Sequence, residues 1–171
     1  LIDTGWGIAE LPAFINSFNE LPLIAAQTHG HPDHACGSFQ FDNVFIHQDD
    51  FYLFEANFKY ENRLWPIENL LKAPFPESFS KERWLNQEMG NVTIMENGQN
   101  FDLGNKNIKT ISLPGHTKGS ICFLDEFEGL LFVGDSIIEG YVWLHLDEST
   151  PLYNYLESLY KINKLKNSFK F

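Results

Sequence analysis

Residues 28–37 read THGHPDHACG and carry a high density of side chains that can bind a metal ion. His29, His31, Asp33 and His34 fall within six positions, and they include three of the six histidines in the chain. Imidazole nitrogens and carboxylate oxygens are ligands that suit zinc and similar divalent cations. A loop can direct His29 and His31 at one point, and Asp33 and His34 at a second point nearby. We therefore predict a metal site here instead of four unrelated structural side chains.

A metal site needs more ligands than one loop supplies, and two further segments offer them. His116 lies in LPGHTKGS, directly after a predicted strand at 108–113. Asp135 lies in LLFVGDS, directly after a predicted strand at 130–133. Loops at strand ends often carry functional groups. Each residue alone is ordinary, since an aspartate before a serine commonly forms a turn or a helix cap.

Short apolar runs predict the strands that position these loops. The run at 23–27 leads into the histidine loop, and 43–47 has the composition of another strand. From residue 92 onward the sequence contains strand-length runs separated by glycine-containing turn signals. These runs are VTIME, NIKTISL, SICFLD and GLLFVGD. Strands alternating with helices indicate a layered α/β domain.

Two amphipathic patterns predict helices. Apolar residues recur at spacings of three and four over 8–18. Ser149 and Thr150 precede Pro151, a sequence that begins a helix well. That helix has a predicted core-facing stripe, which consists of Leu152, Tyr155, Leu156, Leu159, Ile162 and Leu165.

Residues 50–90 differ from the rest because they are rich in aromatic side chains and contain several prolines. We predict one helix near 49–58, followed by irregular or short helical pieces. One interpretation is an inserted subdomain that buries its own aromatic side chains. The other is a lid or wall over a pocket, to which two or three of these side chains contribute.

Composition restricts the classes of partner. The formal net charge of −11 disfavours nucleic acid, which attracts a basic surface. Lysines near the end of the chain suit the solvated side of a helix. No apolar run approaches the roughly 20 residues of a membrane-spanning helix. Two cysteines cannot form a disulfide framework, and with no secretory leader pattern we expect a cytoplasmic protein with a small-molecule substrate.

Four of these segments, in this order, resemble the metallo-β-lactamase superfamily. LIDTG is similar to the strand and turn near the start of that fold, and THGHPDH matches its His-x-His-x-Asp-His signature. PGHTKGS resembles the third-histidine segment, FVGDS resembles the bridging-aspartate segment, and PGHTKGSICFL is most similar to the glyoxalase II branch. The resemblance extends from Leu1 to about Phe169. It implies an αββα sandwich, incomplete at both ends, formed by one domain over 1–171 with the aromatic insertion at about 50–90.

The resemblance also implies a ligand set for up to two zinc ions, with iron or manganese as alternatives. His29, His31 and His116 would hold the first metal. Asp33 and His34 would hold the second, and Asp135 would bridge both. A metal-bound hydroxide would then attack a carbonyl, while Asp33 would orient it, accept its proton and act as the catalytic residue.

The expected substrate is a small ester-like compound: a thioester, a lactone or a β-lactam. A phosphodiesterase or nuclease of the same superfamily is one alternative, and the acidic composition disfavours it. The other is an iron-dependent member that carries out redox chemistry or oxidises a persulfide.

Other ligand-type residues have competing interpretations. Cys36 is either a thiolate ligand or, as we favour, a small side chain that packs the loop. Asp3 is either an acceptor for a ligand imidazole or an ordinary turn aspartate. His47 and His145 are expected not to be ligands, and His145 could still lie at a pocket mouth.

The sequence departs from the family pattern at both ends. The family usually supplies another histidine to the second metal beyond the helix after the bridging aspartate, and no histidine follows His145. Strands that usually precede DTG are also absent. We expect a core fragment of a longer protein, in which the first metal binds more tightly than the second.

Overall fold

The computed structural model describes residues 1–72 and 74–170. The chain forms two compact units, which are described separately. Unit 1 comprises Leu1–Ile46 and Phe51–Thr93, and unit 2 comprises His47–Asp50 and the chain from Ile94 onward. The boundaries therefore fall close to the ends of the predicted aromatic insertion.

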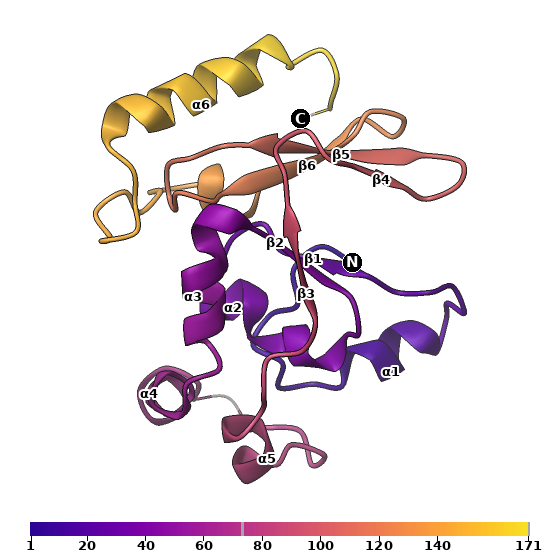
Figure 1. The fold of residues 1–171 in the computed structure, drawn as a ribbon, viewed down its shortest axis with the longest axis vertical. Coiled ribbons are helices and arrows are strands. Elements are labelled where there is room, and N and C mark those ends of the chain that lie inside the picture. The colour runs from indigo at the N-terminus through magenta and orange to yellow at the C-terminus, as the bar shows by residue number, and fades with distance from the viewer. Residues whose placement is uncertain (73, 171) are drawn as a thin grey trace. The chain divides into compact units, whose positions relative to one another are not determined.

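The first part of the chain contains short helices and a sheet with parallel strands (Figure 1). Strand β1 pairs with β2 in parallel, with Ala25 opposite Val44, and the sheet order is β1-β2-β3. Ile2 forms a parallel bridge to Ala26. The elements, in order, are α1 (Leu11–Asn16), β1 (Ala25–Ala26), α2 (Pro32–Ala35), the 3₁₀ helix η1 (Cys36–Gln40), β2 (Val44–His47), η2 (Gln48–Asp50), α3 (Phe51–Ala56), α4 (Tyr60–Asn69), α5 (Lys81–Leu85) and β3 (Val92–Met95).

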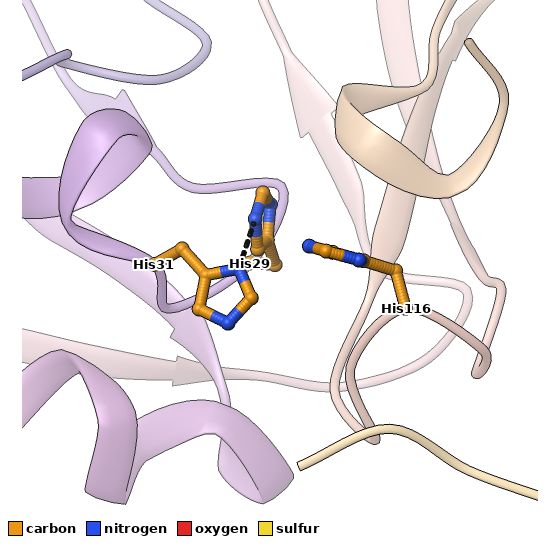
Figure 2. Close-up of side chains that lie close together, drawn as sticks. All are labelled: His29, His31 and His116. Atoms are coloured by element: carbon orange, nitrogen blue, oxygen red, sulfur yellow. Dashed lines mark hydrogen bonds between the residues drawn. The ribbon is translucent and has the colours of Figure 1, made fainter. Parts of the chain in front are cut away.

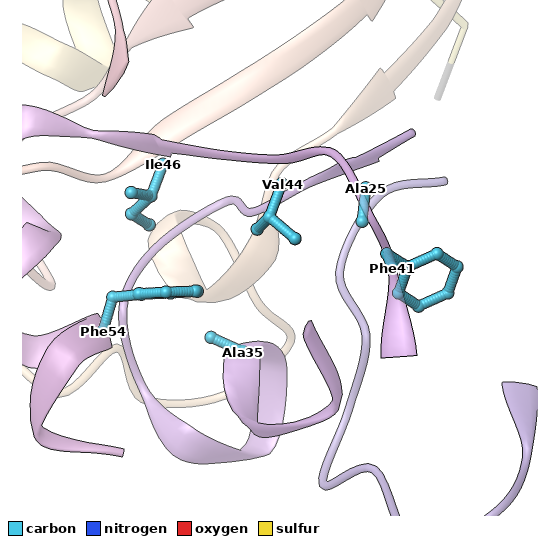
Figure 3. Close-up of a cluster of buried hydrophobic side chains, with 6 residues drawn as sticks. All are labelled: Ala25, Ala35, Phe41, Val44, Ile46 and Phe54. Atoms are coloured by element: carbon cyan, nitrogen blue, oxygen red, sulfur yellow. The ribbon is translucent and has the colours of Figure 1, made fainter. Parts of the chain in front are cut away.

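The core of unit 1 lies between its strands and helices α2 and α3. Figure 3 shows the buried side chains that form it, which are Ala25, Ala35, Phe41, Val44, Ile46 and Phe54. A second cluster places Trp84 and Leu85 of the aromatic insertion against Cys36. This packing supports the interpretation of an insertion that buries aromatic side chains for part of the segment only, since Tyr52, Tyr60, Trp65 and Phe75 remain exposed.

Unit 2 contains an antiparallel sheet and a long helix (Figure 1). The sheet order is β4-β5-β6-β7, and Ile111 on β5 lies opposite Cys122 on β6. Ile162 of the helix packs in one cluster with Leu113 and Leu124. The elements are β4 (Asn100–Asp102), β5 (Asn107–Ser112), β6 (Ile121–Asp125), β7 (Leu130–Phe132), η3 (Gly134–Ser136) and α6 (Leu152–Lys164).

The amphipathic patterns overestimated how much helix surface is buried. Helix α1 has six residues, and Phe14 and Phe18, two members of its apolar pattern, are about two-thirds exposed. On α6, Leu152 and Leu156 are exposed, and the buried side chains are Ser158 and Ile162. The predicted stripe is therefore wrong at Leu152 and Leu156, whereas Ile162 and Leu165 belong to the hydrophobic cluster of unit 2.

Two further findings concern composition. Across residues 1–72 and 74–170, no helix combines the length and the apolar character that crossing a membrane requires.

Both cysteines are free and buried, and burial raises the pKa of Cys36 and of Cys122 to about 12. Cys36 packs in one cluster with Trp84 and Leu85, which favours the packing role for this side chain.

Candidate metal centre

The histidine loop of unit 1 is shaped by a short helix that begins inside the motif. His31 is the N-cap of α2, Pro32 occupies its first turn, and Asp33 is acidic near the helix N-terminus. His29 is 1% exposed, while half of the Asp33 side chain is exposed. The motif thus presents a buried imidazole and an accessible carboxylate from nearby positions.

A hydrogen-bonded chain fixes the tautomer of His29. The Thr28 hydroxyl donates to Asp3 Oδ2 at 2.9 Å, and its oxygen lies 3.0 Å from His29 Nδ1. Because the hydroxyl hydrogen is directed at the carboxylate, the Thr28 oxygen accepts, and His29 Nδ1 must carry the proton. The lone pair of His29 is therefore on Nε2, the nitrogen available to a metal.

The same aspartate fixes His34. Its Oδ2 lies 2.8 Å from His34 Nδ1, and a carboxylate accepts, so that Nδ1 carries the proton. His34 Nε2 is then the lone-pair nitrogen, and it lies 3.7 Å from Asp33 Oδ2. This geometry supports the interpretation of Asp3 as an acceptor for a ligand imidazole. Asp3 is also the only non-glycine residue in the described chain with a positive φ, at 56°.

The donors of this loop fit a divalent cation. His29 Nε2 and His31 Nδ1 lie 3.1 Å apart, and Figure 2 marks the hydrogen bond between the two side chains with a dashed line. Two nitrogens bound to one tetrahedral zinc at about 2.0–2.1 Å lie roughly 3.3–3.4 Å apart. Because His29 Nε2 has the lone pair, His31 Nδ1 carries the proton and donates it to His29, and a cation can take the place of this proton between the two nitrogens. The pair is therefore suited to binding one metal ion.

Unit 2 carries the other ligand-type residues, and Figure 2 also draws His116 from that unit. His116 is 2% exposed, and its Nδ1 lies 2.8 Å from the main-chain carbonyl of Trp143. A carbonyl can only accept, so His116 Nδ1 carries the proton and Nε2 has the lone pair. That nitrogen lies 3.6 Å from Asp135 Oδ2, a spacing that one cation can bridge.

A buried carboxylate, not anticipated from the sequence, supports the His116 loop. Asp50 is 0% exposed, accepts from the Gly119 N–H at 2.6 Å and accepts from the Thr117 hydroxyl at 2.7 Å. The Ser120 hydroxyl also accepts from the Thr117 N–H. These bonds fix the turn that follows His116. No local pattern distinguished Asp50, since its partners lie 67 and 69 positions away.

Tyr155 on α6 contacts the neighbours of both ligands of unit 2. Its hydroxyl donates to the Ser136 carbonyl at 2.9 Å, next to Asp135. Its ring covers Gly115, next to His116, so closely that a Cβ there would collide with it. The predicted Ser149–Thr150 cap is not formed: the Ser149 hydroxyl donates to the His116 carbonyl instead.

The remaining histidines have other contacts. His47 Nδ1 accepts from the Asp49 N–H at 3.2 Å. His145 is exposed, with its ring centroid 5.9 Å from that of Trp143. That neither binds a metal stays a prediction. The candidate ligands are thus distributed over both units: His29, His31, Asp33 and His34 in unit 1, and His116 and Asp135 in unit 2.

Comparison with known proteins finds one family profile and several relatives of this chain. The profile of the metallo-beta-lactamase superfamily matches residues 1–168. Acyl-coenzyme A thioesterase MBLAC2 of Bos taurus is 30% identical over 153 residues, which cover 82% of this chain and 54% of the bovine protein. Hydroxyacylglutathione hydrolase GloC of Haemophilus influenzae is 29% identical over 149 residues, with 82% and 61% covered. The chain thus spans just over half the length of these relatives.

Solved structures confirm the predicted fold. TTHA1623, in a di-iron-bound form, superposes with a TM-score of 0.69 at 24% identity, covering 96% of this chain and 75% of that protein. The metallo-beta-lactamase family protein TTHA1429 from Thermus thermophilus gives a TM-score of 0.63, also at 24% identity, covering 96% and 61%. At this identity the likeness shows the α/β fold with its parallel and antiparallel sheets.

Proposed function

This chain belongs to the metallo-β-lactamase superfamily, and on that premise we propose that it is a metal-dependent hydrolase of thioesters. The observation that carries the proposal is the tautomer control of His29, His34 and His116. Each has its Nδ1 proton engaged by an acceptor, which leaves Nε2 as a ligand atom. Such fixed acceptors are typical of metal-binding histidines.

The ligand set proposed here is the one that the superfamily signature implies. As that signature implies, His29, His31 and His116 would hold the first metal, Asp33 and His34 would hold the second, and Asp135 would be a ligand of both. When bound, the metal ions would lower the pKa of a water molecule and polarise the substrate carbonyl. Zinc is the proposed metal. The first position offers three imidazoles and the second offers one, so we propose that the first binds more tightly.

Asp33 is the proposed catalytic residue. Its carboxylate is half exposed and can therefore reach both solvent and a bound substrate. Asp33 would accept a proton from the attacking water as the water oxygen bonds to the carbonyl carbon. Once the C–S bond has broken, Asp33 would return this proton to the leaving thiolate. Asp3, Thr28 and the Trp143 carbonyl keep the histidines oriented throughout.

The thioester assignment rests on the relatives, which are an acyl-coenzyme A thioesterase and a hydroxyacylglutathione hydrolase. Both names describe cleavage of a bond between an acyl carbon and sulfur. The net charge of −11 supports a small-molecule substrate over nucleic acid.

The test is the release of free thiol from acyl-coenzyme A and S-acylglutathione substrates, followed with a thiol-reactive dye. We expect hydrolysis that a chelator abolishes and added Zn²⁺ restores. His116→Ala should remove activity, while His145→Ala, at an exposed histidine, should retain it. Metal analysis of the purified protein distinguishes zinc from iron or manganese. Stoichiometric metal with cleavage of a phosphodiester and of no thioester would overturn the proposal.

A further inference from the structure

The peptide between His29 and His31 is held by a side chain from the aromatic insertion. Asn57 is 6% exposed, and its Nδ2 donates to the Gly30 carbonyl at 2.9 Å, within unit 1. The Gly30 carbonyl belongs to the peptide that joins the two histidine positions. A single hydrogen bond from residue 57 therefore restrains the orientation of that peptide.

The main chain of Asn57 is held in turn by Arg63. This arginine is 0% exposed, and its Nε donates to the Asn57 carbonyl at 2.7 Å. Its two terminal nitrogens donate to the carbonyls of Trp84, at 2.9 Å, and Cys36, at 3.2 Å. Cys36 follows directly after α2, so that Arg63 also contacts the far end of the histidine loop.

The surroundings of Arg63 are aromatic. Its guanidinium carbon lies 4.7 Å from the ring centroid of Trp84, 4.9 Å from that of Phe58 and 5.3 Å from that of Phe39. Among the described residues, no carboxylate forms an ion pair with it. A buried charge is costly when it lacks a counterion, and carbonyl oxygens and ring faces compensate for this cost. The arrangement uses all three nitrogens of the guanidinium fork to hold main chain in place.

We propose that Asn57 and Arg63 are positioning residues that clamp the histidine loop at both ends, through Gly30 and Cys36. The aromatic insertion is then the support that keeps His29 Nε2 and His31 Nδ1 close enough to bind one cation. This inference rests on the proposed function, because it treats the loop as a metal-binding loop. It assigns a role to a segment for which the sequence left two interpretations open.

Asn57→Ala is the primary test, because it removes one donor and leaves Arg63 and its contacts intact. We expect the affinity for Co²⁺ or Zn²⁺, measured by competition with a chelator, to fall by about 10-fold to 100-fold. We also expect faster amide hydrogen exchange at residues 29–34 in the metal-free protein. The matched control is Asn69→Ala, since that exposed side chain donates to the Trp65 carbonyl of its own helix.

Arg63→Lys tests the other arm while retaining the charge. Lysine lacks the fork that reaches three carbonyls, so faster exchange should extend to residues 34–36. Arg83→Lys, at an exposed position on α5, is its control. Because Arg63 acts partly through Asn57, whose carbonyl it holds, the double variant should lose less metal affinity than the product of the single losses.

The outcomes separate the two proposals. If the wild-type chain binds metal and Asn57→Ala matches it in both affinity and exchange, the clamp is refuted and the proposed function stands. If the wild-type chain binds no metal but Asn57→Ala loosens residues 29–34, the clamp stands and the proposed function fails. Equal exchange together with no metal binding would refute both.

Discussion

Asp3 Oδ2 lies 2.8 Å from Nδ1 of His34, a residue 31 positions later in the chain. The same carboxylate accepts from the Thr28 N–H at 2.7 Å and from the Thr28 hydroxyl. One aspartate thereby orients His34 directly and His29 through Thr28. Its positive φ of 56° is uncommon outside glycine, and the three hydrogen bonds explain how the backbone is kept there.

Replacing Asp3 by asparagine should weaken metal binding more than it weakens the fold. The amide has one acceptor oxygen and cannot serve Thr28 and His34 in the same way, so the imidazole tautomers become mixed. We expect metal affinity to fall by about 10-fold to 100-fold, measured by chelator competition. Asp42→Asn, at an exposed aspartate, is the matched control. Wild-type affinity in Asp3→Asn would contradict the assigned role.

Replacing Asp50 by asparagine should destabilise unit 2. The buried carboxylate accepts from the Gly119 N–H and the Thr117 hydroxyl, and an amide group would direct N–H at one of these donors. Hydrogen bonds to charged groups contribute about 1.5–3 kcal/mol each, so we expect the free energy of unfolding to fall by about 2–3 kcal/mol. Urea denaturation measures this. The control is Asp49→Asn, at the neighbouring exposed residue, which should change the free energy of unfolding little.

The hydroxyl of Tyr155 should contribute to stability in a pH-dependent way. Tyr155→Phe loses the bond to the Ser136 carbonyl, which costs about 1 kcal/mol at neutral pH. Desolvation raises the pKa of Tyr155 above its usual value of 10.0. Near pH 10 and above, the unfolded chain loses the phenol proton more readily than the folded chain does. The free energy of unfolding of the wild type should therefore decline as the pH rises above about 10. Urea midpoints across pH 7–11 test both effects, with Tyr160→Phe as the exposed control. A pH profile identical in Tyr155→Phe and wild type would contradict the second effect.

Asp125 should stabilise the sheet of unit 2 at neutral pH and lose this effect in acid. The Glu128 N–H, followed by the hydrogen bond and charge of Lys106, holds the pKa of Asp125 below its usual 3.8. A lowered folded-state pKa means that the stabilisation is present above the unfolded value and disappears as pH falls through the folded one.

The measurement for Asp125 is the unfolding midpoint of Asp125→Asn and wild type between pH 2 and 7. We expect the variant to be less stable at pH 7 and the difference to shrink towards pH 2. Glu126→Gln, next in the chain and exposed, is the control. A difference that grows in acid would have the wrong sign and would rule out this linkage.

The sequence by itself determined the ligand-type residues and most of the strands. The local spacing of His29, His31, Asp33 and His34 identifies them as a group. His116 and Asp135 became candidates because each follows a predicted strand, and the resemblance of ordered motifs then implied their roles. The predicted strand at 43–47 is β2, and the β-rich segment after residue 92 contains β3, β5, β6 and β7. Alternation and turn signals identify strands because they depend on neighbouring residues only.

Only the tertiary structure decided which residues support those ligands. For Asp3 the sequence left two interpretations open, an acceptor for a ligand imidazole and an ordinary turn aspartate. No local pattern distinguishes Asp50, which is one acidic residue of a pair, or Arg63, which lies in an aromatic segment. Their hydrogen bonds join residues up to 69 positions apart. Helix surfaces were misjudged for the same reason, as the exposure of Phe14 and Leu152 illustrates. Periodicity shows that a face is apolar, whereas its burial depends on what the rest of the chain places against it.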